Sequence, residues 1–359
     1  MAASATAREE VRRLDPASHS DATRSFEALL RSRIVGQDVA IDAMVEVYQT
    51  FLVGMNPPDR PLANLLFLGP TGSGKTYVVE VVAEALFGNA RAFTKIDCAE
   101  FQQSHEIAKL IGSPPGYVGH HDTQPLLTEE SLARWHTDTL RLSLVLFDEI
   151  EKASEALWQL LLGILDKGEL TLGDNRQVNM ARCVIFLTSN LGASEMSSLI
   201  EGGIGFARER AGVHDAHLDT KIQHSALEAA RRRFSPEFMN RLDKVIVFNR
   251  LKPEHLERVL DLELEKVQRR ITNAAEQQHF TFRCSGEVKE WLLTQGADPR
   301  YGARHLKRVI ERNIVYSLAN LVATGQAVTG DCIEIDIDEH GVLVFSKRVV
   351  VPLMASVAT

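Results

Sequence analysis

The chain has 359 residues, 45% of them hydrophobic and 25% charged, so it is long enough for more than one core and its composition excludes a disordered chain. Its 40 Lys and Arg against 48 Asp and Glu give a net charge of −8, which disfavours non-specific binding to nucleic acid. No apolar run approaches the roughly 18 residues of a membrane span, and the first residues lack the apolar core of a signal peptide. Four scattered cysteines, Cys98, Cys183, Cys284 and Cys332, are interpreted as buried free thiols of a cytoplasmic protein.

Residues 1–24 are polar and carry no periodic pattern, so we expect a mobile lead-in. Phe26, Leu30 and Ile34 then recur at helical spacing, and a second amphipathic helix is predicted over residues 38–52. Short apolar runs follow, alternating with helical stretches, at residues 64–68, 93–97, 144–148, 184–189 and 244–248. Continuous apolar strands are typical of a parallel sheet covered on both faces, so the fold class is α/β with five parallel strands.

The sequence GPTGSGKT fills residues 69–76, between the first apolar run and a helix-prone stretch. A strand, a glycine-rich turn and a helix start form the context of the phosphate-binding loop. Glycines let backbone N–H groups approach phosphates, Lys75 can reach the β- and γ-phosphates, and the Thr76 hydroxyl can ligate Mg²⁺. We therefore predict an ATP site with Mg²⁺, formed by Gly69, Pro70, Thr71, Gly72, Ser73, Gly74, Lys75 and Thr76. Val35 is placed near the adenine, with core packing as the alternative.

Polar side chains end two further strands. Asp148 and Glu149 close the third strand, and Asn190 follows the fourth. The carboxyl ends of parallel strands meet at the ligand-binding edge of a sheet. Asp148 is predicted to assist Mg²⁺ binding, Glu149 to activate the attacking water, and Asn190 to hold that water or the γ-phosphate.

These motifs resemble the second ATPase module of the Clp-type AAA+ unfoldases and disaggregases, over about residues 25–345. The matching stretches are IVGQ (34–37), FLGPTGSGKT (67–76), IDCAEF (96–101), GSPPGYVG (112–119), LFDEIEKA (146–153), LTSNLGA (187–193), FSPEFMNRLD (234–243) and DPRYGARHLKR (298–308). The resemblance implies a large ATPase domain at 25–250, a small α+β lid at 251–350 and a tail at 351–359. Strands at about 279–284, 331–337 and 341–347 and a helix at 287–294 are expected in the lid.

The resemblance also implies roles for three further groups. Arg241 resembles an arginine finger that acts on a neighbouring subunit's ATP, which implies a homo-oligomeric, hexameric ring; pairing with Asp243 is its alternative. Arg304 resembles the second sensor arginine, with a surface helix position as the alternative. Tyr117 and Val118 resemble the pore loop that grips unfolded polypeptide, although the stretch 120–127 departs from the family pattern and makes grip less certain than hydrolysis.

Residues 201–212, EGGIGFARERAG, leave Ile204 and Phe206 without a helical or strand pattern. Ile204, Gly205 and Phe206 resemble the tripeptide by which protease-coupled Clp ATPases dock on their peptidase, and a loop anchored on its own domain is the alternative. No stretch of this sequence resembles the family's amino-terminal substrate domain or its first ATPase module. We therefore expect substrate choice to come from the pore, an adaptor or another subunit.

The preferred hypothesis is an ATP hydrolase that pulls polypeptide through a ring and thereby unfolds it. Alternatives are an AAA+ remodeller of nucleic acid or of one dedicated protein complex, an ATPase subunit coupled to a Clp-type peptidase, and a P-loop phosphotransferase. The acidic balance disfavours nucleic acid, and Arg241 and Arg304 at motor positions disfavour a phosphotransferase.

Overall fold

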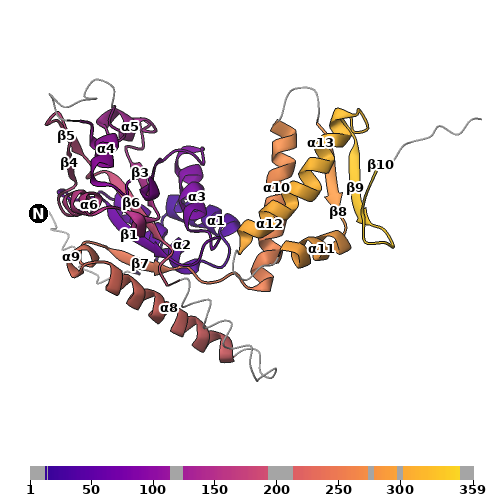
Figure 1. The fold of residues 1–359 in the computed structure, drawn as a ribbon, viewed down its shortest axis with the longest axis horizontal. Coiled ribbons are helices and arrows are strands. Elements are labelled where there is room, and N and C mark those ends of the chain that lie inside the picture. Colours follow the sequence, from indigo (N-terminus) through magenta and orange to yellow (C-terminus); the bar gives the residue numbers. More distant parts are fainter. Residues whose placement is uncertain are drawn as a thin grey trace, which may run out of the picture.

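The computed structural model describes residue 13 and residues 15–113, 124–192, 213–273, 279–296 and 302–347, with the backbone alone for 213–219. None of the described helices combines the length and the apolar character that crossing a membrane requires. Figure 1 shows a larger part built on a parallel sheet and a smaller part built mainly of helices. The chain passes from the first to the second through the segment that leads into helix α10 (Pro253–Asn273).

The sheet of the larger part has five parallel strands in the order β2-β3-β6-β1-β7. Its strands are β1 (Ala63–Leu68), β2 (Thr94–Asp97), β3 (Ser143–Asp148), β6 (Cys183–Ser189) and β7 (Lys244–Val247). Every residue of β1 and β6 is buried, because both faces of the sheet are covered. The predicted α/β class and all five strands are confirmed, each boundary within one residue.

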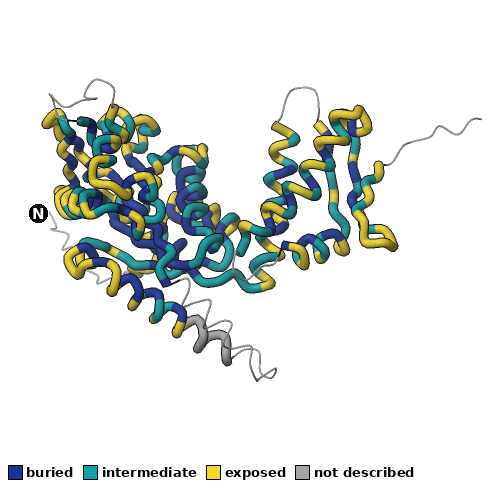
Figure 2. The backbone as a smooth tube through the Cα atoms, in the orientation of Figure 1, coloured by how far each residue is buried: buried dark blue, intermediate teal, exposed yellow. Residues whose placement is uncertain are grey.

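Separate cores form on the two faces of the sheet, and Figure 2 shows buried backbone concentrated along its strands. On one face Leu65 and Phe67 pack with helices α1 (Asp21–Arg33), α2 (Asp38–Leu52) and α3 (Lys75–Phe87). On the other face Leu66 and Leu68 pack with α6 (Glu155–Lys167) and α8 (Val213–Arg233). The alternation of side chains along β1 therefore divides its residues between two cores.

Two expectations about the flanks need correction. Helix α1 begins at Asp21, inside the stretch 1–24 assigned to a lead-in, because Ser20 Oγ accepts the Thr23 N–H and caps the helix. Cys98 and Cys183 are buried as expected, but Cys284 is only partly buried and Cys332 is exposed. Residues along the strand of Cys332 alternate between the core and solvent.

Short elements that the apolar pattern did not predict connect the main ones. A hairpin pairs β4 (Glu169–Thr171) with β5 (Gln177–Asn179), and Asn175 takes the left-handed conformation at its turn, with φ of +68°. Among the described residues, the other α-helices of the larger part are α4 (Ala108–Ile111), α5 (Glu129–Ala133) and α9 (Pro236–Met239).

The smaller part begins with α10 (Pro253–Asn273), whose apolar side packs on a third core with α11 (Gly286–Gly296). Helix α12 (Ala303–Ile310) continues through a π-helical segment, Glu311–Val315, into α13 (Tyr316–Ala323). Strands β8 (Thr281–Cys284), β9 (Cys332–Ile337) and β10 (Leu343–Lys347) form a sheet in the order β10-β9-β8. A small α+β lid was predicted, and this part has that composition.

Candidate functional site

A cleft of about 470 Å³ lies at the carboxyl edge of the large sheet. Its lining comes from the segment between α1 and α2, the loop before α3, the ends of β3 and β6, and helices α10 and α12 of the lid. The structure thus brings together most of the predicted site residues, namely Val35, Thr71, Gly72, Ser73, Gly74, Lys75, Thr76, Asp148, Glu149, Asn190 and Arg304. Gly69 and Pro70 do not line the cleft but bond Lys75 through their carbonyls.

The loop before α3 is shaped as phosphate binding requires. Gly72 and Gly74 have φ of +80° and +98°, a region that L side chains rarely adopt, and Gly74 caps the helix that starts at Lys75. The hydroxyl of Ser73 is buried and finds no hydrogen-bond partner among the described residues. A phosphate oxygen at this helix start would give that hydroxyl an acceptor.

Lys75 is the most constrained charged group of the cleft, with 8% of its surface exposed. Its ammonium donates to the carbonyls of Gly69 at 2.7 Å and Pro70 at 2.9 Å and to Asn190 Oδ1 at 2.9 Å. Burial lowers its pKa to about 8, although the carboxylates of Glu151, Asp148 and Glu149 oppose that shift. A buried, hydrogen-bonded ammonium suits a polyanionic ligand, whose charge would favour the protonated form.

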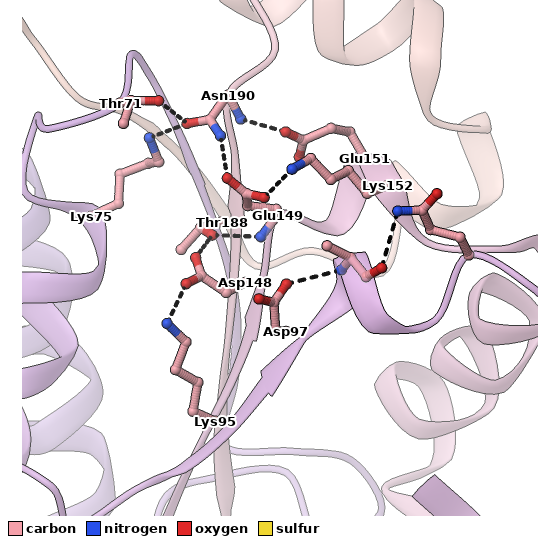
Figure 3. A network of polar contacts seen from close by, with 12 residues as sticks. Thr71, Lys75, Lys95, Asp97, Asp148, Glu149, Glu151, Lys152, Thr188 and Asn190 are labelled. Atoms are coloured by element: carbon pink, nitrogen blue, oxygen red, sulfur yellow. Dashed lines mark hydrogen bonds and ion pairs between the residues drawn. The ribbon is translucent and has the colours of Figure 1, made fainter. Parts of the chain in front are cut away.

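The two acids at the end of β3 point to different partners, as Figure 3 shows. Asp148 accepts a hydrogen bond from Thr188 and pairs with Lys95 at 2.7 Å. Glu149 accepts from Asn190 Nδ2 at 3.1 Å and pairs with Lys152. The backbone of Glu149 is left-handed, with φ of +56°, so the two carboxylates separate in spite of their adjacency.

Asn190 connects the loop to the acids. Its Oδ1 accepts from Lys75, its Nδ2 donates to Glu149, and its backbone N–H donates to Glu151 Oε1 at 3.1 Å. The amide orientation is consistent with both side-chain contacts, since the oxygen faces an ammonium and the nitrogen faces a carboxylate. Asn190 thus links the cation of the cleft to the carboxylate that the sequence assigns to water activation (Figure 3).

The lid closes one side of the cleft. The Ala303 N–H donates to the Gly72 carbonyl at 3.4 Å, and a Cβ added at Gly302 would come within 2.8 Å of the same oxygen. The Lys266 ammonium of α10 lies 4.1 Å from the centre of the Tyr77 ring on α3. Arg304 is exposed on α12 and lines the cleft from this side.

Arg241 is not among the residues that line the cleft. It lies between α9 and β7, where its guanidinium pairs with Glu237 at 3.3 Å and Asp166 at 3.4 Å. Asp243 instead pairs with Arg60, so the alternative pairing of Arg241 with Asp243 is wrong. Tyr117, Val118, Ile204, Gly205 and Phe206 lie outside the described residues, as do residues 120–123 of the stretch 120–127.

The donor set fits Mg²⁺ bound together with a nucleotide. Thr76 and Asp148 line the same cleft, and Mg²⁺ at nucleotide sites takes one or two protein oxygens, with phosphates and waters completing its shell. The described residues contain no cluster of three or more His, Cys, Asp or Glu that would hold a metal without a ligand's help. These two oxygens are therefore matched to a metal that arrives with phosphate.

Sequence reasoning missed four residues that organise the cleft. Lys95 and Lys152 pair with the two acids, and Thr188 touches both acids. Gln37 is buried, donates to the Ser73 carbonyl at 3.2 Å and exchanges two hydrogen bonds with the backbone of Asn249. Gln37, Lys152 and Thr188 lie within the matching stretches IVGQ, LFDEIEKA and LTSNLGA, which is the signal that could have found them, whereas Lys95 lies outside every such stretch.

Two family models match the chain. The model described as "AAA domain (Cdc48 subfamily)" matches residues 60–245, just over half of the chain. The model described as "C-terminal, D2-small domain, of ClpB protein" matches residues 251–335. The first match contains the large sheet up to the start of β7, and the second contains most of the lid.

Among similar proteins, the chaperone protein ClpB of Corynebacterium glutamicum is 37% identical over 317 residues, covering 88% of this chain and 33% of that protein. The ATP-dependent Clp protease ATP-binding subunit ClpC of Staphylococcus aureus is 34% identical over 321 residues, covering 89% of this chain and 37% of that protein. The chain thus spans about a third of the length of these relatives.

Solved structures agree with the sequence matches. An Hsp104:casein complex from S. cerevisiae in an extended conformation has a TM-score of 0.75 and 28% identity, covering 91% of this chain and 53% of that chain. A closed state of Hsp104 with ATPγS and FITC casein has a TM-score of 0.74 and 27% identity, covering 90% of this chain and 51% of that chain. The chain therefore belongs to the AAA domain family of the Cdc48 subfamily and carries after that domain the C-terminal D2-small domain of ClpB protein.

Proposed function

We propose that the chain binds and hydrolyses ATP and uses that reaction, in a ring of copies, to unfold polypeptide. The observation that carries the catalytic part is the position of Asn190, which bonds Lys75 with one end of its amide and Glu149 with the other. A phosphate-binding cation and a carboxylate for water activation then lie on opposite sides of one side chain. This spacing suits a terminal phosphoryl group with an attacking water behind it.

The roles within the cleft follow from their contacts. The loop N–H groups, the Ser73 hydroxyl and Lys75 hold the phosphates, while Val35 lies beside the adenine. Thr76 and Asp148 hold Mg²⁺, which when bound neutralises charge on the phosphates. Glu149 orients the water and takes its proton, Asn190 fixes the position of both, and Arg304 brings a positive charge from the lid.

Polypeptide as the substrate rests on the comparisons. The similar proteins include a chaperone and the ATP-binding subunit of a protease, and both Hsp104 structures contain casein. Tyr117 and Val118 would grip the chain inside the ring. A nucleic-acid or single-complex remodeller and a P-loop phosphotransferase are the competing functions, and neither has a specific observation in its favour.

Assembly into a hexameric ring rests on Arg241. This arginine does not line the cleft of its own chain, so a role in catalysis requires the cleft of another copy. Its ion pairs are with the exposed carboxylates of Asp166 and Glu237, and pairs of this kind contribute about 0–1 kcal/mol. The same guanidinium would then stabilise charge on the neighbour's phosphates. We place this ring in the cytoplasm.

The pKa of Lys75 predicts how ATP affinity depends on pH. Burial favours the neutral amine, so the ligand-free protein loses this proton near pH 8, and ATP then has to restore it. Affinity should fall by about tenfold between pH 7 and pH 9, measured by titration with ATP at fixed Mg²⁺. The Glu151→Gln variant removes the largest opposing charge and should move the midpoint to lower pH; an unchanged affinity across this range in the wild type would contradict the assignment.

Glu149→Gln tests water activation. The amide keeps the shape and an oxygen but cannot take a proton, so turnover should fall by about 10²- to 10⁴-fold while ATP affinity stays within about threefold. Phosphate release and nucleotide titration measure the two effects. Glu155→Gln, an exposed position at the start of α6, serves as the control and should behave as wild type. A parallel loss of binding would reassign Glu149 to nucleotide holding.

Arg241→Ala tests the ring. The variant should bind ATP normally and lose about 10²-fold in turnover, and mixtures with wild-type chain should lose activity non-linearly with composition. Arg283→Ala, on the exposed side of β8, is the control for a lost arginine. The wild-type chain should also be assayed at a dilution at which sedimentation shows it to be a monomer. Full ATP hydrolysis by that monomer would rule out action of Arg241 on a neighbouring subunit.

Tyr117→Ala tests the mechanical output. The variant should keep basal ATPase activity but lose the unfolding of a fluorescent protein that carries an unstructured tag. Tyr316→Ala is the matched control, because that ring is 66% exposed on α13 of the lid.

Addition of unfolded protein should stimulate hydrolysis and DNA should not. Stimulation by DNA alone would favour the nucleic-acid remodeller.

A Clp-type peptidase remains a second candidate partner, supported by the ClpC relative and by Ile204, Gly205 and Phe206. Ile204→Ser with Phe206→Ser should abolish co-purification with such a peptidase and leave hydrolysis unchanged. Leu126→Ser, a 48% exposed apolar side chain elsewhere, is the control. A drop in thermal stability with intact peptidase binding would instead make this tripeptide a structural anchor.

A further inference from the structure

Thr188 stands between the two acids of the cleft. It is the second-last residue of β6, with 1% of its surface exposed. Its hydroxyl donates to Asp148 Oδ1 and accepts the Glu149 N–H at 3.0 Å (Figure 3). One side-chain oxygen thus touches the carboxylate of the first acid and the backbone of the second.

The sheet dictates this position. In the parallel register of β3 and β6, Phe147 lies opposite Leu187, so Asp148 and Thr188 come next on the two strands. Phe147 and Leu187 both face the core with α6 and α8, and their successors face the other way because side chains alternate along a strand. The hydroxyl therefore meets Asp148 at the edge of the sheet where the cleft lies.

The chemistry of a hydroxyl matches both contacts. It has one proton to donate and lone pairs to accept, and here it uses one of each. Valine would fill the same volume but would leave the Glu149 N–H and Asp148 Oδ1 without this partner. Because the Thr188 side chain has 1% exposure, its hydroxyl is a buried partner of both groups, and its loss removes two hydrogen bonds.

The backbone of Glu149 needs such a restraint. Its left-handed conformation, with φ of +56°, costs about 1–2 kcal/mol for a residue with a side chain. Two bonds hold the turn, one from its N–H to Thr188 and one from the Lys152 N–H to its carbonyl at 3.0 Å. The nearby Ser189 hydroxyl instead accepts the Leu191 N–H at 3.2 Å, so it does not share this task.

We propose that Thr188 is a positioning residue for ATP hydrolysis, whose single hydroxyl fixes the Asp148 carboxylate and the Glu149 backbone relative to each other. This proposal rests on the catalytic roles given above to Asp148 and Glu149. Asp148 is held from both sides, by Thr188 at Oδ1 and by Lys95 at Oδ2. The Thr188 hydroxyl therefore links the metal-holding carboxylate of one acid to the backbone of the water-activating acid, across two neighbouring strands.

The test compares Thr188→Val, which lacks the hydroxyl, with Thr188→Ser, which keeps it, in the full chain. The valine variant should lose about 10- to 100-fold in kcat, with KM and ATP affinity within about threefold of wild type. The serine variant should retain kcat within about threefold. Thr188→Cys, a weak donor of similar size, covers the case in which valine prevents folding, and it should resemble valine in kcat.

Hydrogen exchange gives a readout that does not depend on activity. In the nucleotide-free protein, the Glu149 amide should exchange faster in the valine variant than in wild type and should stay protected in the serine variant. Amides of β1, on the far side of β6 from the acids, provide the internal control. Equal protection of the Glu149 amide in all variants would overturn the proposal.

A double-mutant cycle separates positioning from a general structural defect. Single-turnover hydrolysis is measured for Thr188→Val, Glu149→Gln and both together. If Thr188 acts through Glu149, adding Thr188→Val to Glu149→Gln should cost less than about twofold further, whereas independent defects would multiply. Multiplied losses, a serine variant as slow as valine, or a valine variant with wild-type turnover would each overturn the proposal. Undiminished turnover of Glu149→Gln would instead refute the catalytic role proposed for Glu149.

Discussion

The buried ammonium of Lys75 is the interaction on which the larger part of the structure depends. A cation with 8% exposure is stable only when its protons are hydrogen-bonded, and here two loop carbonyls and Asn190 accept them. The carbonyls come from the loop after β1, and Asn190 comes from the end of β6. The pairing of β1 with β6 at the centre of the sheet is therefore what allows this cation to be buried.

The same strand order distributes the negative charge around it. Three carboxylates, Glu151, Asp148 and Glu149, raise the pKa of Lys75 against the effect of burial. Two of them also have lysine partners, Lys95 for Asp148 and Lys152 for Glu149. Because β3 lies between β2 and β6, Asp148 is reached by Lys95 from one strand and by Thr188 from the other. The acids therefore remain close together without facing each other.

Sequence patterns predicted the strands and the loop but not this network. Apolar runs and GPTGSGKT are local signals, so the positions of β1 and of Lys75 followed directly. Lys95 and Thr188 reach Asp148 because of the register in which β2 and β6 pair with β3. These strands are distant in the sequence, and no local sequence pattern predicts the register between them. Gln37 was missed for a similar reason, because its partners Ser73 and Asn249 belong to different segments. The β4–β5 hairpin, with three residues in each strand, is too short to show periodicity.

Coupling between the cleft and the lid follows from how the two parts touch. Within the described residues, the contacts at the cleft include a long hydrogen bond from Ala303 to Gly72 and the Lys266 ammonium over Tyr77. Such contacts contribute on the order of 1 kcal/mol each. Arg304 and Lys307 of the lid line the cleft, so a ligand that fills it would touch the lid. A change in the charge of that ligand would alter its contacts with these two side chains. The free energies of such contacts are comparable to those of the contacts that hold the lid. The position of the lid can therefore depend on which nucleotide is bound.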